Sequence, residues 1–487
     1  MRESKKWLLI FCINVFLLAA FSLAVAQDGK MPITTSSEEA RNFYLEGLNL
    51  TDKLRFQEAR QFFESAVKAD PGFALAQLNL AFTLPSAKEF FETFDKARAL
   101  ADKVSDGERF WILSVEAGNN GRPLVQREYF LKMVKLYPND ERAHNLLGNY
   151  YFAQQMYQEA IGQYEEANKI NSEYSQPYNQ MGYAYRFLNK YDKAEKAFQK
   201  YIELIPDDPN PYDSYAELLM KMGQFEKSID NYRKALKINP NFAASHSGIA
   251  TNLNFLGRYD EARQQLKTFY DSALNDGQRR AAYFATAVSY MDQGNSDMAL
   301  AELEKQFSIA AKINDPTNKA GDLQTMGNIL LFIGKPDEAL MKFTQAREEV
   351  LNSDRSDEIK RNARMGYLFN EGRVAAAKKD FEKAKANQAE YSLGAEANNN
   401  KFQIWASHQL AGIIALAEGN YDTAIAEFQQ ANPQNTYNLY RMGLAYKEKG
   451  DKAKAKEMFD QVAKFNQLNN LNYSFVRGKA QKMLASM

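Results

Sequence analysis

A 34-residue period in the stretch 141–242 constrains the fold of this chain more than any other feature. Cut at this period, the stretch stacks in register as ERAHNLLGNYYFAQQMYQEAIGQYEEANKINSEY, SQPYNQMGYAYRFLNKYDKAEKAFQKYIELIPDD and PNPYDSYAELLMKMGQFEKSIDNYRKALKINPNF. A fixed period of this length is typical of repeat proteins, in which each unit buries its apolar face against its neighbours. We therefore expect one elongated array to account for most of the 487 residues.

Each unit carries the same order of small and bulky residues. Bulky residues stand at positions 4 and 24, small residues stand at positions 8, 20 and 27, and Gly and Pro are frequent at positions 15 and 32. Small residues let two helices approach closely, and a proline ends the second helix. The pattern predicts two helices joined by a turn near position 15.

Units of this kind can be followed along most of the chain. We expect a regular array over 40–276 and a looser array over 277–469, which together make about twelve units. The final stretch, 470–487, places apolar residues among basic ones and is expected to form a capping helix that covers the last apolar face. Residues inserted between the looser units lie near 314–319, 353–357 and 392–404, and the last of these is expected to be an exposed loop or a lengthened helix.

This pattern resembles the tetratricopeptide repeat, and the resemblance covers nearly the whole chain after its N-terminal segment. It implies an all-α fold, a tetratricopeptide-repeat α-solenoid in which about twelve helix-turn-helix units wind into a right-handed superhelix. It also implies that the first helix of each unit lines the concave side of the superhelix, where members of the family bind other proteins or peptides.

The N-terminus has the features of a signal peptide over 1–26. Basic residues precede an apolar run, 7–26, which ends in the small residues Ala24 and Ala26 and is followed by a polar segment, 27–39, that we expect to be a flexible lead-in. Export machinery requires these features, so we expect cleavage after Ala26 and a periplasmic or secreted protein. The alternative is an uncleaved run that anchors the chain, because about 20 apolar residues can span a bilayer.

Few residues favour catalysis. The only cysteine, Cys12, lies inside the apolar run, so the mature chain has no thiolate. His144, His246 and His408 all fall at position 4 of their units, which indicates packing between helices and not a general base or a metal ligand. We predict a protein that is not an enzyme and that needs no metal and no cofactor.

Positions 2, 5, 9 and 12 of each first helix are expected to face the groove. Amide, hydroxyl and aromatic side chains dominate there, and an amide can donate and accept hydrogen bonds with an extended peptide. The candidate peptide-binding residues are Arg142, Asn145, Asn149, Phe152, Gln176, Asn179, Tyr183, Arg186, Asn210 and Asp213. The same positions hold Glu217 and Met220 later in the last of these units, and Ala244, Ser247, Thr251 and Asn254 in the next unit.

The leading functional hypothesis is an exported scaffold that binds a protein or an extended peptide in this groove. Nucleic acid is not an expected partner, since the formal net charge is +0 and basic clusters are short. A membrane is expected as a partner only if residues 7–26 stay uncleaved, which would give a membrane-tethered assembly factor of the cell envelope. The second alternative is an enzyme with its site in one of the irregular regions, 85–106 or 392–404.

Overall fold

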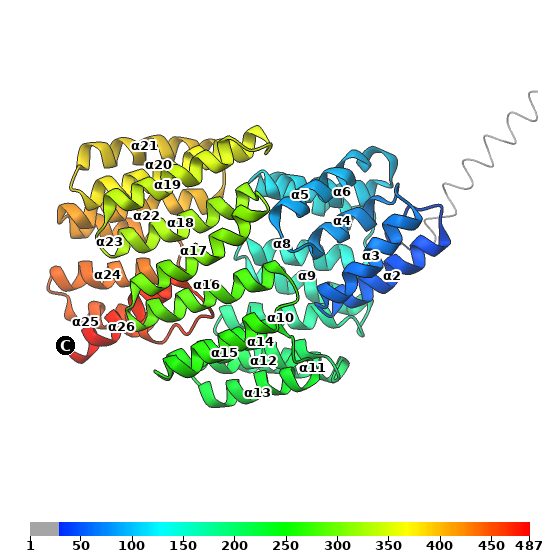
Figure 1. Ribbon diagram of the computed structural model, residues 1–487, viewed down its shortest axis with the longest axis horizontal. Helices are drawn as coiled ribbons and strands as arrows, with labels where there is room; N and C mark the ends of the chain where they lie inside the picture. Colours follow the sequence, from blue (N-terminus) through cyan, green and yellow to red (C-terminus); the bar gives the residue numbers. More distant parts are fainter. Residues whose placement is uncertain (1–28) are drawn as a thin grey trace, which may run out of the picture. The chain divides into compact units, whose positions relative to one another are not determined.

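The computed structural model describes residues 29–487, which form twenty-five α-helices, one short 3-10 helix and no strand (Figure 1). The predicted all-α class is therefore confirmed. The 24 helices from α2 to α25 alternate as first and second helices of twelve successive units, as the repeat pattern predicted, and α26 follows them. The expected signal peptide and Cys12 lie outside the described residues.

The helices before residue 189 are α2 (Glu38–Asp52), α3 (Phe56–Ala69), α4 (Ala74–Thr83), α5 (Ala87–Ala99), η1 (Ala101–Lys103), α6 (Asp106–Asn119), α7 (Pro123–Leu136), α8 (Glu141–Ala153), α9 (Tyr157–Ile170) and α10 (Ser175–Phe187). Those after it are α11 (Tyr191–Leu204), α12 (Pro209–Lys221), α13 (Phe225–Ile238), α14 (Ala243–Phe255), α15 (Tyr259–Asp271), α16 (Asp276–Gln293), α17 (Ser296–Lys312), α18 (Pro316–Phe332), α19 (Pro336–Leu351), α20 (Asp357–Ala377), α21 (Phe381–Asn398), α22 (Lys401–Glu418), α23 (Tyr421–Gln430), α24 (Thr436–Glu448), α25 (Lys452–Ala463) and α26 (Leu471–Ala485).

The described residues divide into two compact units. Unit 1 runs to Thr83 and continues through Thr93–Ala117 and Val125–Leu188, whereas unit 2 comprises Leu84–Glu92, Gly118–Leu124 and Asn189–Met487. Two short segments from early in the chain are thus part of unit 2, where the Lys88 backbone N–H donates to Asp315 at 3.0 Å and Arg122 pairs with Glu358. This division rests on contacts between residues, whereas the predicted arrays over 40–276 and 277–469 rest on the spacing of the repeats. The two divisions therefore describe different properties of the chain.

The looser spacing after residue 276 is taken up mainly as longer helices. The first helices α8, α10, α12 and α14 have 13 residues each, whereas α20 has 21 residues and α22 has 18. The stretch 392–404 therefore forms the end of α21 and the start of α22, and only a short turn at Asn399 separates the two helices.

A glycine on the first helix and an aromatic ring on the second set the distance between the two helices of a unit. A Cβ atom added to Gly148 of α8 would lie 2.5 Å from the Tyr164 ring of α9, which is fully buried. Only a residue without a side chain fits there, because the backbone of α8 rests on the ring. The same arrangement recurs, at the same sequence spacing, in Gly47 with Phe63, Gly327 with Phe343, Gly412 with Phe428, and Gly443 with Phe459.

The turn between the two helices contains a residue in the left-handed conformation. Gly257 has φ +75° and Gly419 has φ +80° at this point. In units that lack the glycine, the turn keeps the same conformation with Gln155 at φ 55° and Lys379 at φ 61°. The repeat geometry thus holds even where the preferred residue is missing, at a modest cost in local strain.

The segment predicted to be a flexible lead-in, 27–39, makes hydrogen bonds in its described part with the N-terminal ends of the first helices α6 and α8 and with Asp70, which caps the C-terminal end of α3. The Met31 backbone N–H donates to Asp140 at 2.7 Å, the Thr34 N–H donates to Glu108 at 2.7 Å, and the Thr35 hydroxyl donates to Asp70 at 2.5 Å. α2 then begins at Glu38, where the Ser37 hydroxyl accepts from the Ala40 N–H.

The predicted capping helix is present as α26, and it packs against α16, α24 and α25. Val476 is fully buried, and Phe475 stacks on Phe332 of α18 with ring centroids 4.3 Å apart. The helix therefore does more than cover α25, because it also contacts α16 and α18, which are first helices of earlier repeats.

Replacing Gly148 by alanine tests the glycine–aromatic contact. The added methyl group must displace Tyr164 or the backbone of α8, and we expect a loss of about 1–2 kcal/mol in the free energy of unfolding, measured by urea denaturation. Gly162 of α9 is the matched control, because nothing lies within 4 Å of its added Cβ. There, the better helix propensity of alanine is expected to stabilise by up to ~1 kcal/mol. Equal effects at the two glycines would contradict this account.

Candidate protein-binding face

The three histidines connect the two helices of their own units. His144 Nδ1 lies 2.9 Å from Gln163 Oε1, His246 Nδ1 lies 2.5 Å from the Gln265 amide, and His408 Nδ1 lies 2.8 Å from Glu427. Burial lowers the pKa of His246, so its ring stays neutral at pH 7. This geometry confirms the packing role that the repeat position predicted. Within residues 29–487, no group of His, Cys, Asp and Glu could hold a metal ion.

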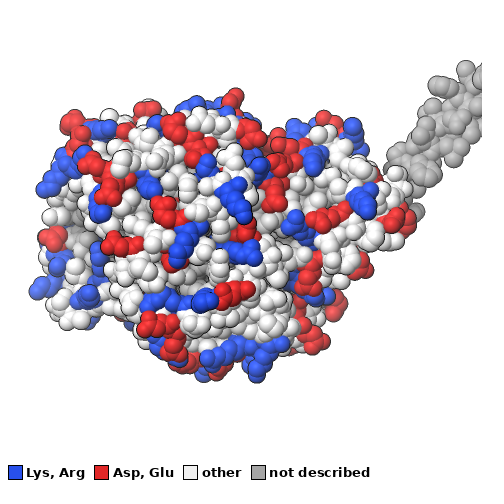
Figure 2. Space-filling model, viewed as in Figure 1, with Lys and Arg blue, Asp and Glu red and all other residues white. Residues whose placement is uncertain are grey.

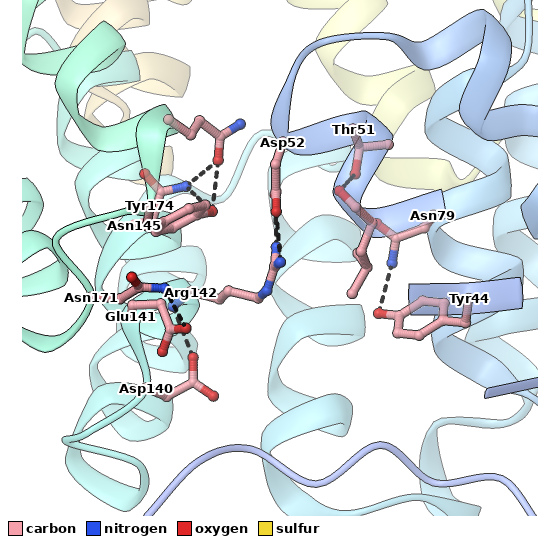
Figure 3. Close-up of polar contacts among 12 residues, drawn as sticks. Tyr44, Thr51, Asp52, Asn79, Asp140, Glu141, Arg142, Asn145, Asn171 and Tyr174 are labelled. Atoms are coloured by element: carbon pink, nitrogen blue, oxygen red, sulfur yellow. Dashed lines mark hydrogen bonds and ion pairs between the residues drawn. The ribbon is translucent and has the colours of Figure 1, made fainter. Parts of the chain in front are cut away.

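Arg142 ties together first helices of unit 1 that are far apart in the sequence (Figure 3). Its guanidinium, on α8, donates to both oxygens of Asp52, at the end of α2, over 2.7 and 2.6 Å. The Cζ atom lies 5.4 Å from the centre of the Tyr174 ring. Burial raises the pKa of Tyr44 and of Tyr174, so both phenols beside this ion pair stay neutral. The bidentate contact makes Arg142 a structural anchor of this face.

Side-chain amides join α8 to α10. Asn145 Nδ2 donates to Gln176 Oε1 at 2.6 Å, and Gln180 Nε2 donates to Asn149 Oδ1 at 3.4 Å. Positions 5 and 9 of one first helix therefore pair with positions 2 and 6 of the next. The Tyr164 hydroxyl donates a second hydrogen bond to Asn149 at 2.9 Å, which fixes the orientation of that amide.

An aromatic group closes the other end of the same face. The Tyr157 and Phe187 rings stack with centroids 4.8 Å apart, and Phe152 meets both rings edge-on. The Arg186 guanidinium lies 4.8 Å from the Tyr183 ring centre and 5.0 Å from that of Phe187. This face of α8 and α10, from Arg142 to Arg186, is called the amide face below.

The structure brings eight of the ten predicted residues together on the amide face, although in different environments. Asn145 and Asn179 are 3% exposed, whereas Asn149, Phe152, Gln176, Tyr183 and Arg186 are half-buried. Asn145 is therefore a structural residue of the network and not an accessible contact. Asp52, Tyr44 and Gln180 were missed, since no repeat position singles out a residue that lies across the face from Arg142.

The two remaining candidates, Asn210 and Asp213, lie on α12 in unit 2, where both are buried. Asn210 Oδ1 accepts from the Tyr201 hydroxyl at 2.9 Å, and Asp213 accepts from the Ser245 hydroxyl at 2.6 Å. The expectation that these two side chains face an open groove is therefore wrong. They connect α12 to the adjacent helices α11 and α14.

The C-terminal segment of the chain packs against α14, the next first helix of unit 2, and against the end of α12. The Thr251 hydroxyl of α14 donates to Asn469 at 3.0 Å, and Arg477 donates to the Phe255 carbonyl at 2.9 Å. The Lys221 ammonium, at the end of α12, donates to the Phe465 carbonyl at 2.6 Å. Ser247, Thr251 and Asn254, expected to line the groove, are consequently all buried.

Positive and negative side chains are interspersed over the face of the molecule that Figure 2 shows. Most exposed ion pairs join residues one helical turn apart, as Arg258 and Glu261 do at 2.6 Å. Such pairs contribute little to stability. Because positive and negative side chains alternate, this face has no large region of a single charge sign. None of the helices from α2 to α26 is long and apolar enough to cross a membrane.

Models of known families match four segments of the chain. One model, described as TPR repeat, matches residues 216–251, and three described as tetratricopeptide repeat match 116–174, 175–208 and 415–473. A search of curated proteins finds no match.

Two of the solved structures that match this chain are described as tetratricopeptide repeat proteins. YrrB, described as a TPR protein with an unusual peptide-binding site, is 20% identical, with 37% of this chain and 91% of YrrB covered and a TM-score of 0.26. A tetratricopeptide repeat protein from Parabacteroides merdae is 19% identical, with 53% of this chain and 99% of that protein covered and a TM-score of 0.37.

Replacing Asp213 by asparagine should change how stability depends on pH. Burial, helped by the charge of Glu217, raises the pKa of Asp213 to about 8 in the folded chain, against about 4 for an unfolded aspartate. The folded state therefore holds a proton that the unfolded state releases, so the carboxyl group destabilises the fold progressively as pH rises from about 4 to about 8. We expect Asp213→Asn to melt near the wild-type temperature at pH 4 and above it at pH 8.

Differential scanning calorimetry across this range measures both melting temperatures. Ser245 keeps an acceptor in the variant, because the asparagine side-chain oxygen replaces the carboxyl oxygen. A constant difference between the two proteins at every pH would show that Asp213 does not titrate as described.

Proposed function

This chain belongs to the tetratricopeptide repeat proteins, and on that premise we propose that it is an exported, non-catalytic scaffold that binds a protein or an extended peptide on the amide face. Members of the family commonly bind other proteins through the first helices of their repeats. The inner positions of α12 and α14 are buried in internal contacts, so among the four first helices with predicted groove residues, α8 and α10 keep suitable groups accessible.

One observation carries the proposal. Asn149 Nδ2 and Gln180 Oε1 make no hydrogen bond with any described residue, and neither atom is shut off from solvent. The hydrogen bond between the same two side chains holds both amides in place, so a donor and an acceptor are presented side by side. A peptide backbone offers one N–H and one C=O per residue, which such a pair can satisfy together.

The aromatic group beside these amides supplies apolar contact. Phe152 and Tyr183 are both half-buried, and the stacked rings of Tyr157 and Phe187 hold Phe152 in one orientation. Rigid aromatic side chains lose little entropy on binding and often carry much of the energy of an interface. The amide face thus combines oriented hydrogen-bonding groups with a fixed apolar surface.

The double variant Asn149→Ala/Gln180→Ala tests the proposal by affinity capture from an envelope fraction. We expect the double variant to capture at least about tenfold less partner than the wild type, because two oriented hydrogen bonds are removed. The matched control, Asn231→Ala/Gln264→Ala, removes two amides from the second helices α13 and α15 and is expected to retain the partner. Recovery of the same proteins by all three chains would contradict binding at the amide face.

Export is tested separately by mass spectrometry of the chain purified from its native cells. Cleavage after Ala26 predicts a protein whose first residue is Gln27. A chain that still carries residues 7–26 would contradict cleavage and favour the membrane-tethered assembly factor. This result bears only on localisation, because the amide face belongs to the described part of the chain.

A further inference from the structure

A pocket in unit 2 lies outside the inner positions of the first helices. It has a volume of about 540 Å³ and is lined by residues of the second helices α11 and α13 and of the end of α12, which packs against both (Figure 1). This volume is within the range of about 300–1,000 Å³ that is typical of small-ligand sites. The pocket is separate from the amide face, which belongs to unit 1.

The pocket lies where the sequence departs from the apolar pattern of the repeats. Position 21 of one repeat and position 7 of the next are apolar and buried in the preceding and in the following pair of repeats; these residues are Ile161 and Met181, and Ile229 and Ile249. At the pocket, the same two positions hold Glu195 and Tyr215, and both side chains are half-buried. A polar pair thus replaces an apolar one between these two repeats.

Tyr215 fixes the carboxylate of Glu195. The Tyr215 hydroxyl donates to Glu195 Oε1 at 2.6 Å. Burial, together with this hydrogen bond and the charge of Glu195, raises the pKa of Tyr215 to about 12, so the phenol remains a donor at pH 7. No Lys, Arg or His among the described residues lies within 4.0 Å of the Glu195 carboxylate, which therefore has no ion-pair partner within the chain.

Two lysines of α13 also line the pocket. Lys227 and Lys234 are seven residues apart, so they lie on the same side of the helix, separated by about two turns. Their ammonium groups donate to neutral amide oxygens at 3.1 and 3.4 Å, and neither has a carboxylate of the described chain within 4.0 Å. The remaining charged residue of the lining, Asp230, pairs with Arg233 at 3.4 Å.

The end of α12 contributes an apolar surface. Leu218 and Leu219 are buried, whereas Met222, directly after the helix, is 40% exposed. A methionine side chain is unbranched and flexible, so it adapts to the shape of an apolar group placed against it. The pocket thus combines one carboxylate and two ammonium groups that lack an ion-pair partner with an accessible apolar side chain.

We propose that this pocket binds a free amino acid with an apolar side chain. The ammonium group of such a ligand pairs with Glu195, its carboxylate pairs with Lys227 or Lys234, and its side chain contacts Met222. A ligand with a single charge would contact only one of the two kinds of charged group. The proposal does not depend on binding at the amide face, because no residue of that face lines the pocket.

Isothermal titration calorimetry of the full chain with four small molecules tests the proposal. L-leucine carries the ammonium, the carboxylate and an apolar side chain, whereas isocaproate lacks the ammonium, isoamylamine lacks the carboxylate and glycine lacks the side chain. We expect L-leucine to bind and each of the other three to bind at least about tenfold more weakly. No binding of L-leucine, or equal affinity for L-leucine and any of the other three, would overturn the proposal.

Variants of the charged groups assign the contacts. Glu195→Gln keeps an acceptor for the Tyr215 hydroxyl, and it should lose at least about tenfold in affinity for L-leucine while its weak affinity for isocaproate stays unchanged. Lys227→Gln/Lys234→Gln should show the same loss for L-leucine and no change for isoamylamine.

The matched control is Lys237→Gln/Lys267→Gln, which removes two exposed lysines of α13 and α15 that do not line the pocket. It should bind L-leucine within about twofold of the wild type. An equal loss of L-leucine affinity in the control and in the pocket variants would show that net charge, and not the pocket, governs binding, and it would contradict the assignment.

Discussion

The close approach of a glycine to an aromatic ring sets the geometry on which the rest of this structure depends. In α8 and α9, the backbone at Gly148 rests directly on the buried Tyr164 ring, and the same contact recurs in units near both ends of the chain. Because the ring fixes the distance and rotation of the two helices, it also fixes which side chains of the first helix point inward. The Tyr164 hydroxyl shows this coupling, since it donates to Asn149 on the amide face.

The inner positions of the first helices, which are positions 2, 5, 9 and 12 of each repeat, have different roles along the array. At α8 and α10 they form a network of amides that remains partly accessible, and Arg142 anchors it to Asp52. At α12 and α14 they are buried, because the chain's own C-terminal segment and neighbouring helices occupy the space. A single repeat geometry thus supports internal closure at some first helices and an accessible surface at others.

Sequence reasoning succeeded where the determining contacts are local. The period predicted the twelve helix pairs, the turn near position 15 and α26, since each depends on residues within one or two repeats. The packing role of His144 followed in the same way, because its partner Gln163 belongs to the same unit. The groove candidates on α12 failed for the opposite reason: Asn210 and Asp213 occupy standard inner positions, and only the three-dimensional structure shows what covers them. Nothing in the repeat pattern relates Arg142 to Asp52, because the two residues lie in different repeats and only the three-dimensional structure brings them together.

The most direct test of the account is site-specific crosslinking within the cells that produce the protein. A photoreactive amino acid placed at Gln180, on the amide face, should form a covalent adduct with another protein, and the same amino acid at Gln264 of α15 should not. Mass spectrometry of the adduct identifies the partner and the crosslinked peptide. An adduct specific to position 180 is the result that the account predicts, whereas no adduct there, or the same adduct at both positions, would contradict it.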